Sequence, residues 1–349
     1  MSVKLTQFAH GAGCGCKIAP SVLQQILKSD MNFKKYSDLL VGYESSDDAA
    51  IYNIGMGLGL ISTTDFFTPI VDDAFDFGRI AAANAISDVY AMGGKPIMAL
   101  SILGFPIDKL PLEIAGKMLD GARAICEEAG ISLAGGHSID IPEPVFGLSV
   151  SGLVPFNQIK KNNTANEGDF IFLTKPVGTG ILATAGKRGV LLPEHEKQLV
   201  AQMATLNRVG EELGKIEGVS AMTDVTGFGL AGHLIEMAEG SGLSAEIWYD
   251  KIKLMDGVKS YLSQKMIPDA TYRNWNSYGK KINFDNGVDV MEAFSVLPDP
   301  QTNGGLLISV TQDSLEQVIT ILEKSGLSLF NDPIGKFVPI QQHSIFVQS

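Results

Sequence analysis

The stretch that decides the domain organisation is residues 155–174, PFNQIKKNNTANEGDFIFLT. Pro155 ends an apolar run, and the polar segment from Lys160 to Glu167 follows it. The apolar run from Phe170 to Thr174 then predicts a new strand. A polar segment between two patterned regions is typical of a domain boundary, and the length of the chain fits about two domains. We therefore expect a domain to end near residue 156.

The half before this boundary mixes strand and helix patterns. A short helix is expected to begin at Pro20, and a longer one to begin at an N-cap Asp76 and run to about Met92, before the glycine pair at 93–94. A further helix is expected over 111–129. The expected strands of this half are 49–54, 58–64, 97–103, 131–134 and 145–154.

The half after the boundary also mixes the two patterns. Strands are expected at 170–174, 221–224 and 306–310, and helices near 179–187, 194–214, 230–239 and 313–324. Residues 256–298 give no clear pattern. The mixture, with some hairpin-like spacing, favours α/β or α+β halves over one regular parallel sheet.

The charge balance excludes some classes of function. Lys and Arg number 27 against 39 Asp and Glu, a net charge of −12, which argues against a nucleic-acid surface. The hydrophobic fraction of 45% excludes a largely disordered chain. No run approaches the roughly 20 apolar residues of a membrane span, and the start does not resemble a signal peptide. Three cysteines at 14, 16 and 126 suit a reducing, cytoplasmic location.

The most unusual segment is HGAGCGCK, residues 10–17. Its glycines disfavour a stable helix, so residues 1–17 are predicted to form a mobile arm whose thiols lie outside the core. A Cys-x-Cys pair is too small for a zinc site and is not the usual redox spacing, which leaves a nucleophile or a carrier of a soft atom. Lys17 is expected to favour the thiolate or to reach a phosphate.

Aspartates at loop edges and strand ends form the second candidate constellation. Asn84 and Asp88 share one face of the predicted helix, and the aspartates at loop edges and strand ends are Asp47, Asp48, Asp65 and Asp224. Any one of them is best explained as a capping or turn residue. As a group they predict Mg²⁺ ligands that leave room for phosphate oxygens. His137, on a turn after a strand, is a candidate phosphate donor.

Other nucleotide signatures are weak. The chain has no phosphate-binding G-x-x-x-x-G-K-[ST] motif. Gly227 to Gly232 matches G-x-G-x-x-G, but Asp224 lies three residues earlier, where it would face a pyrophosphate. A metal-bridged phosphate or a plain turn is therefore favoured over a dinucleotide site.

Taken together, these motifs resemble selenophosphate synthetase. The resemblance runs in one order from the arm to near the C-terminus and is carried by HGAGCGCK (10–17), TTDFF (63–67), NAISD (84–88), MGGKP (92–96), AGGHS (134–138), MTDVTGFG (222–229) and DPQTNGG (299–305). The arm is the specific part. The aspartate motifs and LTKPVGTG (173–180) are shared more widely, with the aminoimidazole-ribonucleotide synthetase superfamily. Asn303 departs from the serine expected in the last motif.

The resemblance implies a fold and a reaction. The fold would comprise the arm (1–17), an N-terminal α/β domain (18–156) whose strands form a barrel across a homodimer, and a C-terminal α+β domain (157–349). The reaction would convert ATP, selenide and water to selenophosphate, AMP and phosphate, supplying selenium for selenocysteine or modified tRNA. The resemblance leaves open whether selenide arrives free or from a delivery protein.

The resemblance also implies roles for single residues. Cys14 takes the family's cysteine or selenocysteine position, and Lys17 is its essential partner. Mg²⁺ would be held by Asp48, Asp88 and Asp224, and a monovalent cation such as K⁺ is implied. The nucleotide site would be lined by Ser45, Ser46, Asp47, Asp65 and Asp88, with Gly136, His137 and Ser138 contributed by the neighbouring subunit.

Two alternatives stand beside this interpretation. One is another ATP-dependent kinase or synthetase of the superfamily, against which the cysteine-bearing arm argues. The other is a thiol-based carrier or sensor of selenium or sulfur that binds ATP for regulation.

Overall fold

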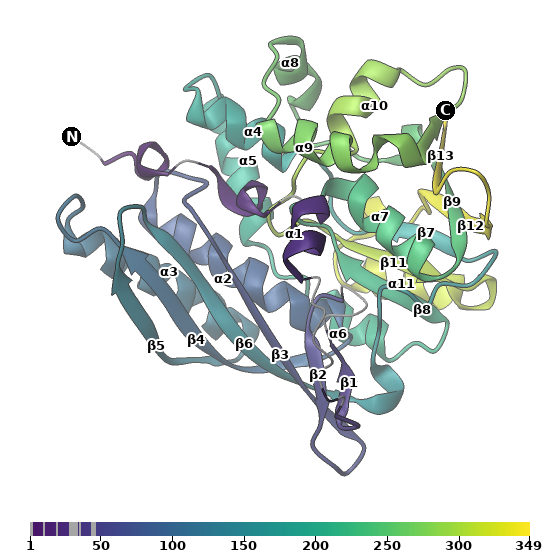
Figure 1. The fold of residues 1–349 in the computed structure, drawn as a ribbon, viewed down its shortest axis with the longest axis horizontal. Helices are drawn as coiled ribbons and strands as arrows, with labels where there is room; N and C mark the ends of the chain where they lie inside the picture. Colours follow the sequence, from purple (N-terminus) through teal and green to yellow (C-terminus); the bar gives the residue numbers. More distant parts are fainter. Residues whose placement is uncertain (1–2, 10, 19, 28–33, 35, 43–46) are drawn as a thin grey trace.

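A computed structural model describes residues 3–9, 11–18, 20–27, 34, 36–42 and 47–349. Within these residues each half of the chain forms its own mixed sheet with helices, one on the left of Figure 1 and one on the right. Among the described residues, no helix is long and apolar enough to cross a membrane. The domain limits at 17 and 156 stay predictions.

The described part of the N-terminal half forms a six-stranded sheet in the order β1-β2-β3-β6-β4-β5. Neighbouring strands are antiparallel except β4 and β5, which are parallel. The bounds are β1 Leu39–Val41, β2 Ala50–Asn53, β3 Leu58–Phe67, β4 Lys95–Phe105, β5 Ser132–Asp140 and β6 Val145–Pro155. β5 is longer than the predicted 131–134 because it continues through the AGGHS motif beside β4.

Two long helices cover one face of this sheet, α2 (Ala74–Ala91) and α3 (Leu112–Ala129) (Figure 1). Gly78 allows the two helices to approach closely, because a Cβ at this position would lie only 1.9 Å from the Met118 carbonyl oxygen. The N-cap of α2 is Asp73, whose side chain accepts from the backbone N–H of Asp76, so the predicted cap was three residues late. The other face of the sheet carries exposed apolar side chains such as Phe66, Leu100 and Ile139.

The described part of the C-terminal half forms a seven-stranded sheet in the order β10-β13-β9-β12-β7-β11-β8. Its strands are β7 Phe170–Leu173, β8 Val219–Asp224, β9 Leu243–Trp248, β10 Ile282–Phe284, β11 Leu306–Val310, β12 Gly335–Pro339 and β13 Ile345–Gln348. β11 is antiparallel to both β7 and β8, so those two strands are parallel to each other. The loops that follow β7 and β8 therefore leave the same edge of the sheet.

Helices surround this second sheet. They are α4 Thr179–Lys187, α5 Pro193–Ala204, α6 Val209–Gly214, α7 Gly229–Gly240, α8 Val258–Ser263, α9 Asp269–Tyr278, α10 Val290–Val296 and α11 Leu315–Lys324. The single helix predicted over 194–214 is wrong, because the chain breaks between α5 and α6. At the break, Asn207 donates to the Ser87 hydroxyl and to the Gly304 carbonyl, contacts that a continuous helix would not place there.

The N-terminal segment lies between the two halves. Its described elements are the 3₁₀ turns η1 (Leu5–Phe8) and η2 (Gly13–Cys16) and the helix α1 (Pro20–Leu27). Figure 1 shows this segment crossing from the edge of the first sheet towards α9 and α7. This placement brings the cysteine-bearing turn η2 to the junction of the two halves.

Candidate active site

β3 and α2 together present four polar side chains. The Thr63 hydroxyl donates to Asp88 Oδ2 at 2.5 Å, and Asn84 Nδ2 donates to Asp65 Oδ2 at 2.5 Å. Alternate strand positions lie about 6.8 Å apart, and helix positions four residues apart rise about 6 Å. The two spacings match, so the TTDFF and NAISD motifs face each other as two bonded pairs.

The C-terminal half adds a carboxylate to this face. Asp224 is the last residue of β8, and the hydroxyl of its neighbour Thr223 donates to Asp48 Oδ1 at 2.7 Å. Asp48, which precedes β2, is thereby held close to the end of β8. The second carboxylate oxygens of Asp48 and Asp224 are buried without a hydrogen-bond partner.

The three aspartates repel one another. Burial, followed by the charge of Asp224, raises the pKa of Asp48 and of Asp88 well above the ordinary value. Burial also raises the pKa of Asp224 to about 6, although the Ser87 hydroxyl and Lys17 lower it. Buried carboxylates with free lone pairs are stabilised by a bound cation. Within the described residues, however, no group of three or more His, Cys, Asp or Glu side chains is arranged to hold a metal ion.

The arm places Cys14 against this cluster. The Cys14 backbone N–H donates to Thr302 Oγ1 at 3.0 Å, and its thiol donates to Asn84 Oδ1 at 3.2 Å. The Cys14 side chain is only 1% exposed and packs within the main hydrophobic core. The expectation that neither thiol belongs to the core is therefore wrong for Cys14, whereas Cys16 is exposed.

Lys17 lies beside the same carboxylates. Its Nζ is 3.7 Å from Asp65 Oδ2, and its side chain is 39% exposed. Although the side chain as a whole is exposed, loss of hydration around its ammonium end lowers the pKa of Lys17. Asp65 and the other acidic groups outweigh this effect, so the pKa lies above the ordinary value and the ammonium persists.

The surroundings of the Cys14 thiol favour its protonated form. Burial and the charge of Asp65 raise its pKa, and Lys17 lowers it by less. Lys17 thus favours the thiolate, as expected, but burial and Asp65 outweigh it and the pKa of Cys14 lies above its ordinary value. A ligand that brings further positive charge or water would be needed to deprotonate Cys14.

Contacts from both halves hold the arm. Gly13 N–H donates to the Thr68 carbonyl at 3.2 Å, and Arg273 donates to the Gly15 carbonyl at 2.7 Å. A Cβ at Gly227 would lie 2.6 Å from the Cys14 carbonyl oxygen. The G-x-G-x-x-G turn after β8 thus contacts the arm through its first glycine. The predicted mobility of the arm stays a prediction.

The remaining predicted site residues fall into two groups. Asp47 accepts from the Asn162 N–H at 2.8 Å, next to Asp48, whereas Ser45 and Ser46 lie outside the described residues. The other group is exposed on the edge strand β5 and comprises Gly136, His137 and Ser138.

The strand pairings place β5 away from the site of its own chain. Asp65 pairs with Leu148, Leu148 with Ser101, and Ser101 with Gly136. Three strand spacings amount to about 14 Å. Within one chain, His137 is therefore separated from the carboxylate cluster.

Some residues of the site were not predicted. Asn84 was noted only as the neighbour of Asp88 on one helix face, although its amide joins Cys14 to Asp65. Thr302 holds the Cys14 backbone from the far end of the chain. Thr302 lies in the DPQTNGG motif, which contributed to the family resemblance but did not indicate a role for this residue.

Each half of the chain matches a domain of one protein family. The profile of the AIR synthase related protein N-terminal domain matches residues 46–154, and that of the C-terminal domain matches residues 166–348. A selenide, water dikinase of Pasteurella multocida is 56% identical over 329 residues, covering 94% of this chain and 93% of the relative. One from Haemophilus influenzae is 52% identical over 346 residues, covering 99% and 98%.

Solved structures share the fold at low sequence identity. Thiamine-monophosphate kinase from Stenotrophomonas maltophilia superposes with a TM-score of 0.64 at 21% identity, covering 95% of this chain and 96% of that one. A HypE–HypF complex gives a TM-score of 0.67 at 17% identity, covering 94% and 95%. The expected two-domain fold is thus confirmed in outline, whereas the sheet of the single chain is open and forms no closed barrel in its described part.

Proposed function

The chain belongs to the selenide, water dikinases of the AIR synthase related family, and it synthesises selenophosphate from ATP, selenide and water. We propose that its arm positions selenium and that its carboxylate cluster binds the metal and the phosphates. This assignment is supported by the two hydrogen bonds of Asn84, whose amide accepts from the Cys14 thiol and donates to Asp65. One side chain thereby joins the residue suited to selenium to a carboxylate on the phosphate side.

Cys14 and Lys17 are the proposed catalytic residues. Cys14 positions selenium, because a buried thiol offers a soft, poorly hydrated contact. Lys17 reduces the repulsion between an anionic selenium acceptor and the ATP phosphates. The docked arm excludes water from the reacting phosphate, which protects it from hydrolysis before selenide reacts.

Mg²⁺ is proposed on the chemistry of these carboxylates, with phosphate oxygens of the nucleotide needed to complete its ligand set. The proposed ligands are Asp48, Asp88 and Asp224, because two of them keep a buried oxygen without a partner and their mutual repulsion favours a cation. When bound, Mg²⁺ supplies charge neutralisation for phosphate oxygens, which commonly complete its coordination. We also propose K⁺ as the monovalent cation that the family resemblance implies.

ATP is the phosphate donor, and its site is proposed along the same face. The residues proposed to line it are Ser45, Ser46, Asp47, Asp65, Asp88 and Lys17. Solved neighbours support a nucleotide site in this fold, since one is a kinase complexed with AMPPCP and another carries ATP.

A homodimer is proposed to complete the site. The open face of the N-terminal sheet exposes Phe66 (51%) and Ile139 (54%), side chains that a second copy would cover. Pairing two such sheets would form the predicted barrel and bring Gly136, His137 and Ser138 to the neighbouring subunit's nucleotide.

The cellular setting is proposed from cysteine chemistry. Each of the three cysteines is a free thiol, as a reducing cytoplasm would keep them. A selenium-delivery protein remains a candidate partner, and no nucleic acid or membrane partner is proposed.

Product analysis tests the proposed function. Purified protein is incubated anaerobically with ATP, Mg²⁺ and K⁺, with and without selenide, and followed by ³¹P NMR. Selenide-dependent AMP, phosphate and a new phosphorus resonance are expected. ADP alone would indicate a kinase with another acceptor, and thiol occupancy without turnover would indicate a carrier or sensor.

A further inference from the structure

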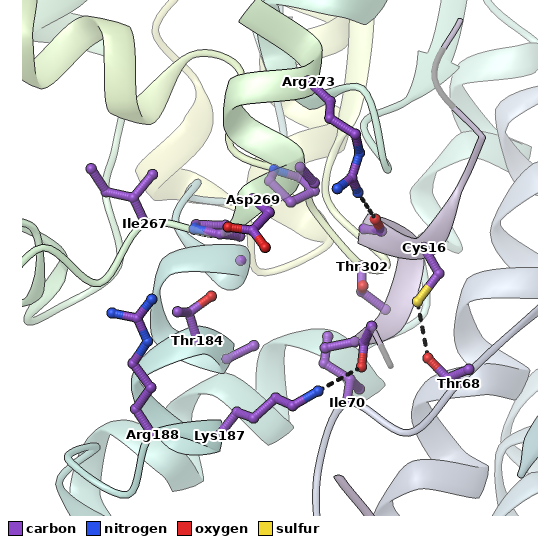
Figure 2. A pocket seen from close by; sticks show the side chains of 18 residues that line it. Cys16, Thr68, Ile70, Thr184, Lys187, Arg188, Ile267, Asp269, Arg273 and Thr302 are labelled. Atoms are coloured by element: carbon purple, nitrogen blue, oxygen red, sulfur yellow. Dashed lines mark hydrogen bonds between the residues drawn. The ribbon is translucent and has the colours of Figure 1, made fainter. Parts of the chain in front are cut away.

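A cavity of about 520 Å³ lies on the outer side of the arm. Its walls come from the arm, from the loop between β3 and α2, from α4 and from the first turns of α9 (Figure 2). Thr302 lines it and also holds the backbone of Cys14, so the cavity adjoins the catalytic residues.

The cavity is positively charged in a protein of net charge −12. Lys187, Arg188 and Arg273 line it, against the single acid Asp269. Arg273 donates to the Gly15 carbonyl and Arg188 to the Lys265 carbonyl, both neutral acceptors. Among the described residues, neither arginine forms an ion pair, so their charges are available to an anionic ligand.

Cys16 brings a thiol to the wall of this cavity. Its sulfur lies 2.9 Å from Thr68 Oγ1, on the opposite side of the space from Arg188 (Figure 2). Cys16 also lines a smaller cavity of about 180 Å³ that contains Cys14, Lys17 and Asp65. It is therefore the thiol shared by the outer cavity and the catalytic side.

We propose that the outer cavity binds a small anionic thiol carrying selenium, R–S–SeH, and that Cys16 is the first acceptor of that selenium. The cavity is much larger than a selenide ion needs and lies within the range of about 300–1,000 Å³ typical of small-molecule sites. Its cations suit the carboxylates of a peptide-sized thiol. This inference rests on the proposed function, because it supplies the selenide that the reaction consumes.

The transfer proceeds by thiol exchange. The Cys16 thiolate attacks selenium, a Cys16 S–Se bond forms, the carrier S–Se bond breaks, and the carrier leaves as its thiolate and takes the proton lost by Cys16. A second carrier thiol then attacks the Cys16 sulfur, which forms a mixed disulfide and expels hydrogen selenide. A third thiol releases Cys16 as the free thiol and leaves the carrier disulfide. The net reaction is R–S–SeH plus R–SH giving R–S–S–R plus H₂Se.

The test compares two selenium sources under anaerobic conditions. Glutathione selenopersulfide, freshly prepared from selenodiglutathione and one equivalent of glutathione, is compared with free selenide. The readout is the ratio of kcat/KM for carried selenium to kcat/KM for free selenide. C16S and R188Q should each lower this ratio about ten-fold, the loss of one strong contact. R123Q, which removes the same charge from the surface of α3, should leave the ratio unchanged.

A second readout needs no nucleotide. After incubation with the carried selenium and alkylation, mass spectrometry should find a selenium adduct on the Cys16 sulfur. The proposal would be overturned if C16S or R188Q left the kcat/KM ratio unchanged, or if the selenium adduct formed on Cys14 alone. Either result would overturn it even if a delivery protein restored turnover by another route. Failure of the unsubstituted chain to make selenophosphate from free selenide would instead contradict the proposed function.

Discussion

The amide of Asn84 joins the Cys14 thiol, 3.2 Å from its oxygen, to the Asp65 carboxylate, 2.5 Å from its nitrogen. Its oxygen also accepts from the Asn303 backbone N–H at 2.7 Å. Asn84 therefore contacts the arm through Cys14, β3 through Asp65 and the C-terminal half through Asn303. No apolar residue reproduces these bonds. N84A should lower kcat for selenophosphate formation about 100-fold, the loss typical of one positioned polar group.

N53A is the matched control for this change. Asn53 lies at the end of β2 and bonds Asp38 and the Gly55 backbone, away from the site. Equal losses in N84A and N53A, measured by AMP release with folding checked by circular dichroism, would show that the Asn84 contacts are not specific to the chemistry.

Gly227 controls how closely the arm can dock. Its added Cβ would meet the Cys14 carbonyl at 2.6 Å and the Lys17 side chain at 3.1 Å, so the arm would have to shift. G227A should lower selenide-dependent turnover about ten-fold, because a misplaced reacting group reduces the rate steeply. G116A, at an open position on α3, is the control and should retain full activity. Unchanged turnover in G227A would mean that the docked arm is not the reacting state.

The carboxylate cluster should oppose stability when no cation is bound. Asp48 is half-buried near Asp224, and one of its carboxylate oxygens is buried without a hydrogen-bond partner. D48N removes a repelling charge and should raise the free energy of unfolding by about 1–2 kcal/mol while abolishing turnover. Urea unfolding of the metal-free protein measures the first effect. A destabilised D48N would contradict the repulsion between Asp48 and Asp224.

Stability without Mg²⁺ should fall as the pH rises. The pKa of Asp224 is about 6 in the folded chain against an ordinary 3.8, so folding favours its protonated form. That contribution is present below pH 3.8 and is lost as the pH rises through about 6. The proposed Mg²⁺ would bind the deprotonated carboxylates, so the Tm gained with Mg²⁺ should be larger at pH 8 than at pH 5. An equal or smaller gain at pH 8, by differential scanning calorimetry, would argue against Asp224 as a ligand.

The sequence predicted most elements because local patterns determine them. Helices near 111–129 and 179–187 and the strand at 306–310 lie where periodicity indicated. The break near Asn207 was missed, since it depends on Ser87 and Gly304, which are distant in the sequence. Tertiary contacts of this kind leave no periodic signal.

The site was only partly predictable for the same reason. Aspartates after strands and a thiol among glycines pointed to residues that the structure brings together. The burial of Cys14 and its raised pKa depend on packing against Asn84 and Thr302, which no local pattern shows. Burial outweighs the adjacent Lys17, so the pKa of the Cys14 thiol is raised in the docked arm.

The most direct test of the roles proposed for Cys14 and Lys17 is selenophosphate yield, by anaerobic ³¹P NMR, for the unsubstituted chain, C14S and K17A side by side. If Cys14 positions selenium and Lys17 offsets the phosphate charge, both variants should lose selenophosphate formation. If C14S keeps full selenide-dependent turnover while K17A abolishes it, the role assigned to the buried thiol is contradicted and Lys17 alone carries the chemistry of the arm.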